Sequence, residues 1–480
     1  MNPLLISILI ASYFVVLIGI SYLTNKKQSN DEFFTGGKQS PWYVVAFGMI
    51  GASLSGVTFI SVPGWVETSG FSYMQMVFGY FFGYLVIMYV LLPLYYRLNL
   101  ISIYGYLEQR FGKYSYKTGA SFFLLSRIIS ASFKLFLVAN ILQLLIFDAI
   151  GIPFFVTVAI TIILIWVYTF KSGIKTIIWT DTIQTFLMLG AVSLIIILIS
   201  EKLNINFSNL FSHISNSEYS TTFHFEDSSA PNYFWKQFLA GMFLTIVMTG
   251  LDQDMMQKNL TCKTLKDSRK NMFWMSASLF VVNLLFLSVG VLLIEYAQAS
   301  GIDAHNDNLF PVIATQSGLG ISAAILFVLG LIAATYSSAD SALTSITTSF
   351  SVDILEIGKM DANKAIKIRK AVHLGASLIL MGVIILFGYV ISDNVIKELF
   401  TFVGYTYGPL LGLYAFGLFT KIQVKDKYIP LVAIASPIIS YIVKLNSFEW
   451  FGYNFGFELL IFNGLITFVG LLLLKKKSTT

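Results

Sequence analysis

Residues 48–58 read GMIGASLSGVT, and they lie in the middle of an apolar segment that extends from about residue 41 to residue 64. An apolar run of ~20 residues crosses a bilayer as a helix, because a helix bonds all of its backbone polar groups internally. Glycines and serines halfway along such a helix favour an unwound turn, whose freed carbonyl oxygens face the protein interior. Close helix packing through small residues also explains the stretch, and the stretch alone does not separate the two explanations.

The rest of the chain has the composition of a membrane protein built from such helices. Of its 480 residues, 56% are hydrophobic and 12% are charged, and the mean hydropathy is +0.75. We therefore predict an all-α polytopic membrane protein with about thirteen transmembrane helices. The predicted spans are 3–23, 41–64, 72–96, 118–146, 152–170, 177–200, 234–257, 272–297, 320–352, 368–391, 396–419, 428–445 and 455–474.

Basic residues are sorted between the two sides of this predicted bundle. With the first residue outside, 25 of the 31 Lys and Arg residues fall in the inner connections and the C-terminal tail, and four fall on the outer side. Because basic residues collect on the cytoplasmic side, we predict a multi-pass protein of the plasma (inner) membrane with its N-terminus outside and its C-terminus in the cytoplasm. The net charge of +6 follows from this sorting, so no nucleic-acid partner is expected.

A second break is predicted in the seventh span, where residues 248–257 read MTGLDQDMMQ. The carboxylates of Asp252 and Asp254 are costly in hydrocarbon unless they line a cavity. A hydrated position at the inner interface is the alternative for Asp254. The two breaks lie five spans apart, which is the spacing expected of two five-helix halves related by an inverted pseudo-two-fold axis. A binding site is then expected between the breaks, near the membrane midplane.

Three further motifs resemble those of one transporter family. They are DEFFTGGK at 31–38 with the Pro-Trp pair that follows, YTFKSGIKTIIWTDTIQ at 168–184, and GYTYGPLLG at 404–412. Together they resemble the sodium:solute symporter family, although Ser172 stands where that family usually has a glycine.

The resemblance implies a single transmembrane transporter domain over residues 1–480, in which Na⁺ drives solute uptake. Its core of ten helices, at about 41–419, has the LeuT-type 5+5 inverted repeat with discontinuous helices. A leading helix at 3–23 precedes this core, and trailing helices at 428–474 follow it.

The ninth span carries hydroxyl groups that suit a small cation. Residues 333–345 read AATYSSADSALTS, and hard cations prefer oxygen ligands such as hydroxyls and backbone carbonyls. Hydrogen bonds from these hydroxyls to their own helix or to a neighbouring helix are the alternative. The resemblance implies that the Na⁺ ligands are the carbonyls of Gly51, Leu54 and Ala334 and the hydroxyls of Ser337 and Ser338.

A second cation site is a further hypothesis. Some members of the family hold a second Na⁺ with an aspartate and hydroxyls that correspond here to Asp181, Asp340 and Ser341, so that a carboxylate stands where a hydroxyl is expected. Two carboxylates close together at low dielectric favour a bound cation or a shared proton. The alternative for Asp181 is a carboxylate at a helix N-terminus, stabilised by the helix dipole.

Polar side chains between the two breaks are available to bind a solute. Arg127 and Lys134 lie on one face of the fourth span, where either can neutralise a substrate carboxylate or pair with Asp252 or Asp254. Hydroxyl-rich ligands suit serine, glutamine and aspartate, so we favour a sugar or a sugar acid as the solute. The solute-binding candidates are Ser53, Ser55, Thr58, Gln75, Lys134, Asp252, Gln253 and Tyr405.

The predicted function is Na⁺-coupled symport of a small polar organic solute by alternating access. The alternative within the same fold is a sensor or a channel-like protein, which would bind the solute without concentrating it. The histidines are scattered and make no metal cluster or nucleophile–base pair, and the sequence has no GxxxxGK[ST] loop, so neither an enzyme nor an ATP-driven pump is expected.

Overall fold

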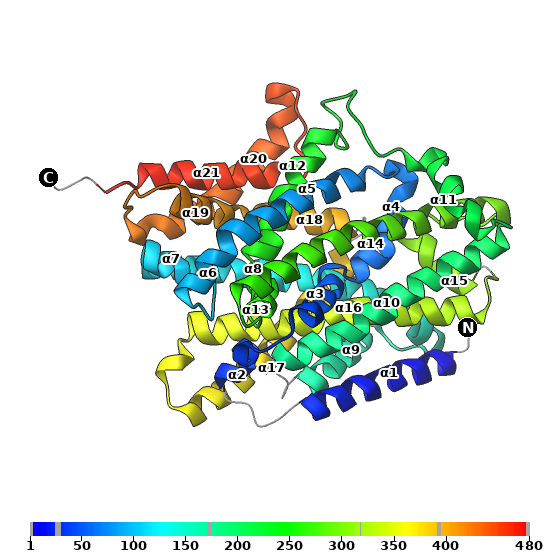
Figure 1. The fold of residues 1–480 in the computed structure, drawn as a ribbon, viewed down its shortest axis with the longest axis horizontal. Coiled ribbons are helices and arrows are strands. Elements are labelled where there is room, and N and C mark those ends of the chain that lie inside the picture. Colours follow the sequence, from blue (N-terminus) through cyan, green and yellow to red (C-terminus); the bar gives the residue numbers. More distant parts are fainter. Residues whose placement is uncertain (1–2, 25–29, 170–173, 317, 391–394, 477–480) are drawn as a thin grey trace.

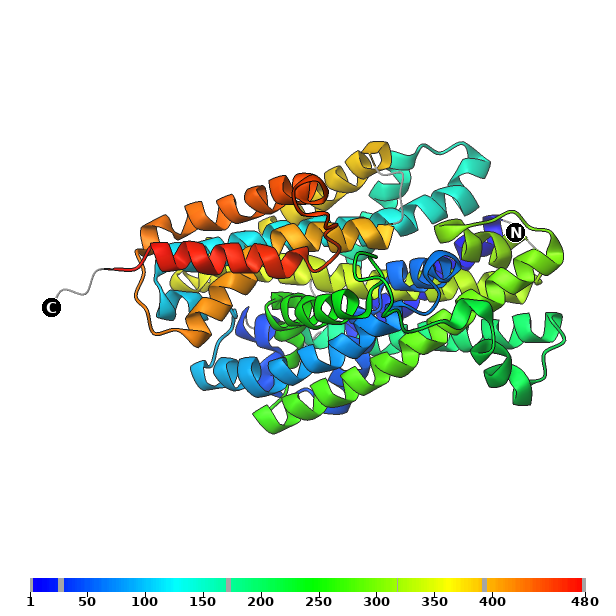
Figure 2. The same ribbon diagram turned by 90° about the horizontal axis from the view of Figure 1, so that it is seen from above.

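The computed structural model describes residues 3–24, 30–169, 174–316, 318–390 and 395–476, and across these ranges the chain forms a bundle of helices without β-strands (Figure 1). The predicted all-α class is therefore confirmed. Helix α1 (Pro3–Thr24) begins at one end of the bundle, and α21 (Leu459–Leu473) finishes at the opposite end in both views (Figure 2). Most long helices run roughly along this axis, as expected where every backbone polar group must be bonded within its helix.

The helices follow the predicted spans closely. Three spans are each built from two helices, and the others are single helices or a helix continued by a π-turn. The continuous helices between α1 and α21 are α5 (Tyr73–Val86) leading into α6 (Leu92–Leu98), α8 (Lys113–Leu142), α9 (Phe154–Thr169), α10 (Ile174–Lys202), α14 (Leu265–Ser300), α16 (Ile321–Ser349), α17 (Ala362–Val390) and α20 (Ile429–Phe451). Short helices in the connections are α2 (Asn30–Thr35), α7 (Gly105–Arg110), α11 (Phe207–Ser215) and α15 (Leu309–Gln316).

The number of membrane crossings depends on how the bent helices are counted. In the described part of the chain, 7 helices are long and apolar enough to cross a bilayer, and 10 crossings result when each bent pair counts as one span. Three shorter apolar helices, at Ile8–Ile20, Phe154–Val167 and Leu459–Leu473, lie beside them. The figure of about thirteen spans stays a prediction.

The second predicted span is broken where the glycine- and serine-rich stretch predicts a break. Helix α3 (Trp42–Ser53) ends at Ser53, Leu54 and Ser55 are extended, and α4 (Gly56–Ser69) begins at Gly56 at an angle of 57° to α3. Close packing explains part of the stretch as well, because a Cβ atom on Gly51 would lie 2.1 Å from Thr185 Oγ1 of α10. Both explanations of this stretch therefore apply, each to different residues.

Two further spans are broken. Helix α12 (Phe234–Thr245) continues through a π-turn at Ile246–Gly250 and meets α13 (Gln253–Asn259) at an angle of 67°. Helix α18 (Val395–Thr406) meets α19 (Gly408–Phe419) at 45°. The first of these breaks confirms the discontinuity predicted from the two aspartates. The second lies at the Gly/Pro-containing motif, where Pro409 cannot donate a helical hydrogen bond.

Helix α10 brings the first break and the hydroxyl-rich helix α16 into the same region, because it packs against both α3 and α16. A second close contact joins α16 directly to the break: a Cβ atom on Gly56 would lie 2.0 Å from Thr335 Oγ1. The fold therefore places the start of α4 against the middle of α16, in the buried centre of the bundle.

Candidate functional site

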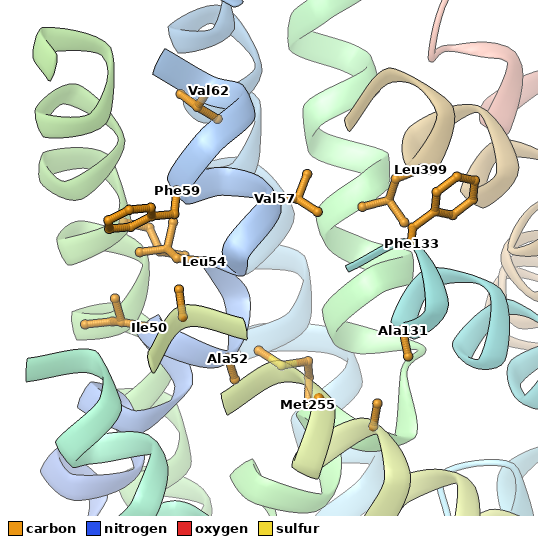
Figure 3. Packing of buried hydrophobic residues seen from close by; sticks show 14 of the residues in the cluster. Ile50, Ala52, Leu54, Val57, Phe59, Val62, Ala131, Phe133, Met255 and Leu399 are labelled. Atoms are coloured by element: carbon orange, nitrogen blue, oxygen red, sulfur yellow. The ribbon is translucent and has the colours of Figure 1, made fainter. Parts of the chain in front are cut away.

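A cavity lies beside the break between α3 and α4. Its volume is about 110 Å³. Residues from α3, α4, α5, α8, α12, α14 and α18 line it, and Figure 3 shows Val57 of α4 pointing toward Leu399 of α18 and Phe133 of α8. The π-turn before α13 also contributes to the lining, so the cavity touches both predicted breaks.

Four of the predicted solute-binding residues line this cavity. Ser53, Ser55 and Thr58 reach it from the first break, and Lys134 reaches it from α8. Lys134 is only 7% exposed, and among the described residues it has neither a hydrogen bond nor an ion pair. A buried ammonium group without a partner is unfavourable.

The other four candidates do not line the cavity. Gln75 contacts the connection between α11 and α12, where its side-chain amide donates to Asn232 O (2.8 Å) and accepts from His224 N (3.1 Å). Tyr405 lies against Tyr441, with the Lys444 ammonium 5.8 Å from its ring centroid. Both lie in the expected span but on another face of the helix.

Asp252 and Gln253 form hydrogen bonds that stabilise the break in the seventh span. The Asp252 carboxylate caps α13 by accepting from the amides of Asp254 and Met255, and it also accepts from Tyr407 Oη at 2.5 Å. Gln253 bonds the connection before α7, through Ile101 O and Ile103 N at 3.0 Å each. Their polar groups are thus used to hold the broken helix in place.

Arg127 lines the cavity and joins three elements beside it. Its guanidinium contacts Asp254 directly and lies 3.7 Å from Asp252 Oδ2, while Tyr407 donates to the same Asp252 oxygen. Tyr407 is the residue between α18 and α19, so this network ties α8 to the two broken spans that contain α13 and α19. Of these two residues of α8, Arg127 therefore has the carboxylate partners, whereas Lys134 lines the cavity without an ion pair to any described residue.

The proposed cation ligands meet at the first break. Ser338 Oγ of α16 donates to Ala52 O at 3.3 Å, and this carbonyl lies between the two predicted carbonyl ligands of Gly51 and Leu54 in the chain. Ala334, Ser337 and Ser338 are buried residues of α16. Gly56, the first residue of α4, packs against the same helix at Thr335. The structure thus brings the two sets of oxygen atoms together, as the cation hypothesis requires, and their role as ligands stays a prediction.

The surroundings of Asp181 differ from the expectation. Asp181 lies in the second turn of α10 and not at its N-terminus, since that helix begins at Ile174. Its Oδ1 accepts from Ser337 Oγ at 2.6 Å, and its Oδ2 lies 2.7 Å from the ammonium of Lys258 and 3.5 Å from Ser341 Oγ. Asp340 accepts from the backbone amide of Ser341 at 2.6 Å.

Lys258 is a functional candidate that the sequence analysis missed. Hydropathy assigns it to a cytoplasmic connection, but it lies in α13 and is fully buried. The bend before α13 turns this half-helix inward, which a hydropathy pattern does not record. Its spacing of four residues from Asp254 is the one signal in the sequence that it shares a helix face with a charged group.

Comparison with known proteins identifies the family. The sequence model of the sodium:solute symporter family matches residues 33–424. The chain belongs to the sodium:solute symporter family. As a member of this family it is a Na⁺-coupled secondary transporter of a small solute and not an enzyme, and Na⁺ is its co-transported ion.

Curated relatives match most of this symporter's length. The sodium/sialic acid symporter SiaT of Proteus mirabilis is 26% identical over 431 residues, which cover 85% of this chain and 82% of that protein. The sodium/sialic acid symporter NanT of Aliivibrio fischeri is 25% identical, with 85% and 81% covered. The human sodium-coupled monocarboxylate transporter 2 is 24% identical and covers 86% of this chain and 68% of its own.

Solved structures support the fold of this symporter. A substrate-bound, outward-open Na⁺-coupled sialic acid symporter superposes with a TM-score of 0.81 at 21% identity, covering 98% of this chain and 99% of that chain. The nucleobase-cation-symport-1 transporter Mhp1, in a closed conformation, gives a TM-score of 0.55 at 14% identity and covers 93% and 94%. The LeuT-type core with discontinuous helices is therefore the fold of this chain.

Three tyrosines of α5 belong to the cavity of this symporter, although the sequence did not single them out. They are Tyr73, Tyr80 and Tyr84, of which the first two share a hydrogen bond of 3.0 Å between their hydroxyls. Asn283 of α14 also lines the cavity, and its Oδ1 has no hydrogen-bond partner among the described residues. Aromatic faces beside free polar atoms are a common lining for polar organic ligands.

Proposed function

We propose that this symporter carries a small, hydroxyl-rich solute with a carboxylate group, a sugar acid, into the cell together with Na⁺. The observation that supports this most is Lys134, a buried ammonium in the cavity wall that has no partner among the described residues. A substrate carboxylate would supply the missing anion, and a charge-assisted hydrogen bond of this kind is worth about 1.5–3 kcal/mol.

The relatives support the same class of cargo. The names of the two bacterial relatives give sialic acid, and the name of the human relative gives monocarboxylates, so these three carry acids. A rabbit relative is named as a multivitamin transporter. The neutral part of the proposed site consists of serine, threonine, tyrosine and asparagine side chains around the cavity. These side chains can form hydrogen bonds with the hydroxyl groups of a sugar acid, which a short apolar acid lacks.

Na⁺ is proposed to bind between the first break and α16, through the carbonyls of Gly51, Leu54 and Ala334 and the hydroxyls of Ser337 and Ser338. These ligands come from two separate helices, so an ion that binds them stabilises the arrangement in which the helices are close. Inward movement of one positive charge gains about 2.3 kcal/mol per 100 mV of membrane potential.

The surrounding architecture is proposed to be one transporter domain over residues 1–480, with a leading helix, a ten-helix core and two trailing helices. It is proposed to lie in the plasma (inner) membrane with its N-terminus outside and its C-terminus in the cytoplasm. The sorting of basic residues supports this orientation. The start of α1 and the end of α21 lie at opposite ends of the bundle, which supports termini on opposite sides of the membrane (Figure 1).

Uptake by purified protein in sealed liposomes tests the proposal. An inward Na⁺ gradient is expected to concentrate N-acetylneuraminate or a simpler sugar acid, and the uncharged alcohol or amide of the same sugar is expected to compete poorly. Lys134→Met should weaken the competition by the acid roughly 10- to 100-fold and leave that of the neutral analogue nearly unchanged.

Lys444→Met is the matched control, because Lys444 lies over the Tyr405 ring and away from the cavity. Equal competition by acid and neutral analogues in the wild-type protein would reject the sugar-acid proposal. Binding of the acid without any accumulation would favour the sensor or channel-like alternative.

A further inference from the structure

The candidate second cation site holds a positive charge that belongs to the chain itself. The carboxylate of Asp181 faces α16, where Ser337 donates to Oδ1 at 2.6 Å. On the other oxygen, Oδ2, the ammonium of Lys258 lies at 2.7 Å, and Ser341 Oγ lies at 3.5 Å. The Lys258 ammonium thus lies against the carboxylate oxygen that a free cation at this site would contact.

Burial makes this contact unusual. Asp181 and Lys258 are both fully buried, and the lysine lies within electrostatic range of Asp254 and Asp340 as well as Asp181. A buried ammonium needs such partners to offset the loss of hydration. A second free cation at the same carboxylate would be repelled by the ammonium, because like charges in a buried site disfavour each other strongly.

The position of Lys258 in the fold explains how the charge reaches this site. It is carried by α13, the short half-helix after the break in the seventh span, and the bend of 67° turns α13 inward against α3, α10 and α16. The side chain of Lys258 therefore belongs to a half-helix that we expect to move in a transporter with an inverted repeat. Its partner Asp181 belongs to a different helix, α10.

We propose that the ammonium group of Lys258 occupies the second cation site as a tethered substitute for an ion, so that this symporter moves one Na⁺ per solute. The proposal rests on the proposed function, because it concerns the ion-to-solute ratio of the same transport cycle. It also assigns a positioning role to Lys258, whose ion pair with Asp181 joins α13 to α10 in the conformation described here.

The ion-to-solute ratio of the wild-type protein is the first test. At zero membrane potential, a tenfold Na⁺ gradient supports about a tenfold gradient of N-acetylneuraminate if one ion is coupled, and about a 100-fold gradient if two are coupled. The expected limit is tenfold. A limit near 100-fold would overturn the inference and leave the proposed function standing, whereas no Na⁺-driven accumulation of any sugar acid would reject both.

Removal of the tethered charge is the second test. Lys258→Met exposes Asp181 to the ions of the medium, so the Hill slope for Na⁺ activation is expected to rise from about 1 toward about 2. Lys258→Met combined with Asp181→Asn removes both charges and should return the slope to about 1, and Lys258→Arg should keep it there. A merely structural lysine would lower the rate without changing the slope.

Lys266→Met is the matched control, because this lysine is exposed at the start of α14 and should give the wild-type slope. An unchanged slope in a folded Lys258→Met protein would overturn the inference. If that variant does not fold, the coupling ratio of the wild-type protein decides the question alone.

Discussion

The break between α3 and α4 and the break between α12 and α13 occupy equivalent positions in the two halves of the core, but they differ in chemistry. The first break offers neutral oxygens: backbone carbonyls at its two extended residues, and hydroxyls of α16 within reach at Ala52. The second carries carboxylates: Asp254 contacts Arg127, and Asp252 accepts hydrogen bonds from the amides of α13.

The difference supports the binding positions proposed for the ion and the solute. Neutral oxygens suit a mobile cation, because they leave no uncompensated charge in the site after the ion has left. A mobile anion is best held by a fixed cation without a fixed partner, and Lys134 is such a residue among those the structure describes. The paired groups, in contrast, hold the broken helices to their neighbours. Three variants test this division between groups that bind cargo and groups that hold the fold.

The largest expected effect is at the neutral oxygens. Ser337→Ala together with Ser338→Ala removes two of the proposed Na⁺ ligands, so Na⁺ stimulation of uptake should be abolished while the protein still inserts. Ser345→Ala is the control, because that hydroxyl bonds Ala342 O of its own helix at 3.0 Å. If uptake by the double variant depends on Na⁺ as uptake by the wild-type protein does, the cation binds elsewhere.

The second effect is on stability and concerns the paired cation. Arg127→Met leaves Asp252 and Asp254 as buried carboxylates without their guanidinium, which is expected to destabilise the fold by about 3–5 kcal/mol. Thermal unfolding in detergent measures the loss, and addition of Asp254→Asn should restore part of it.

Lys134→Met is the natural comparison for Arg127→Met, because both cations lie on α8 and only one of them is paired. Loss of the unpaired ammonium should leave the unfolding midpoint nearly unchanged in the absence of solute. Equal losses of stability in the two variants would contradict the division between cargo-binding and fold-holding charges.

The smallest effect is expected outside the membrane. His305 contacts Glu67 at 2.5 Å and Asp303 at 3.0 Å, and the hydrogen bond to Glu67 raises the pKa of the imidazole above its usual value. Since the folded-state pKa is the higher one, this contact is fully present below about pH 6.5 and is lost as the pH rises through the raised value.

Hydrogen exchange of the segment around residues 301–308, corrected for the intrinsic pH dependence, measures this effect. In the wild-type protein, protection of this segment is expected to fall as the pH rises through the raised pKa of His305. In His305→Ala the segment should be equally unprotected at every pH. A pH-independent protection of the wild-type segment would assign its order to other contacts.

Much of the fold follows from local sequence signals. Glycine and serine at the first break, and two aspartates at the second, predict discontinuities because they are unfavourable in an unbroken apolar helix. The assignment of Ser337 and Ser338 as Na⁺ ligands comes from the family resemblance and stays a prediction. The helix faces are harder to predict, as Gln75 and Tyr405 show, because lipid and protein interior are both apolar and the rotation of a helix leaves little trace in hydropathy.

Lys258 illustrates a different limit of the sequence. A lysine near the end of an apolar segment is assigned to the membrane surface, since the sequence predicts a break before α13 but neither the direction nor the 67° angle of the bend. Its partner Asp181 lies 77 residues earlier in the chain and on another helix. Pairing of this kind depends on the tertiary arrangement, and so the structure was needed to find it.

Equilibrium binding of ²²Na⁺ to the purified protein in detergent tests the central claim most directly, because it requires no transport and no knowledge of the solute. Saturable binding of about one ion per chain is predicted for the wild-type protein and for Lys134→Met, and loss of that binding for the Ser337→Ala, Ser338→Ala double variant. Undiminished ²²Na⁺ binding by a folded double variant would contradict the account.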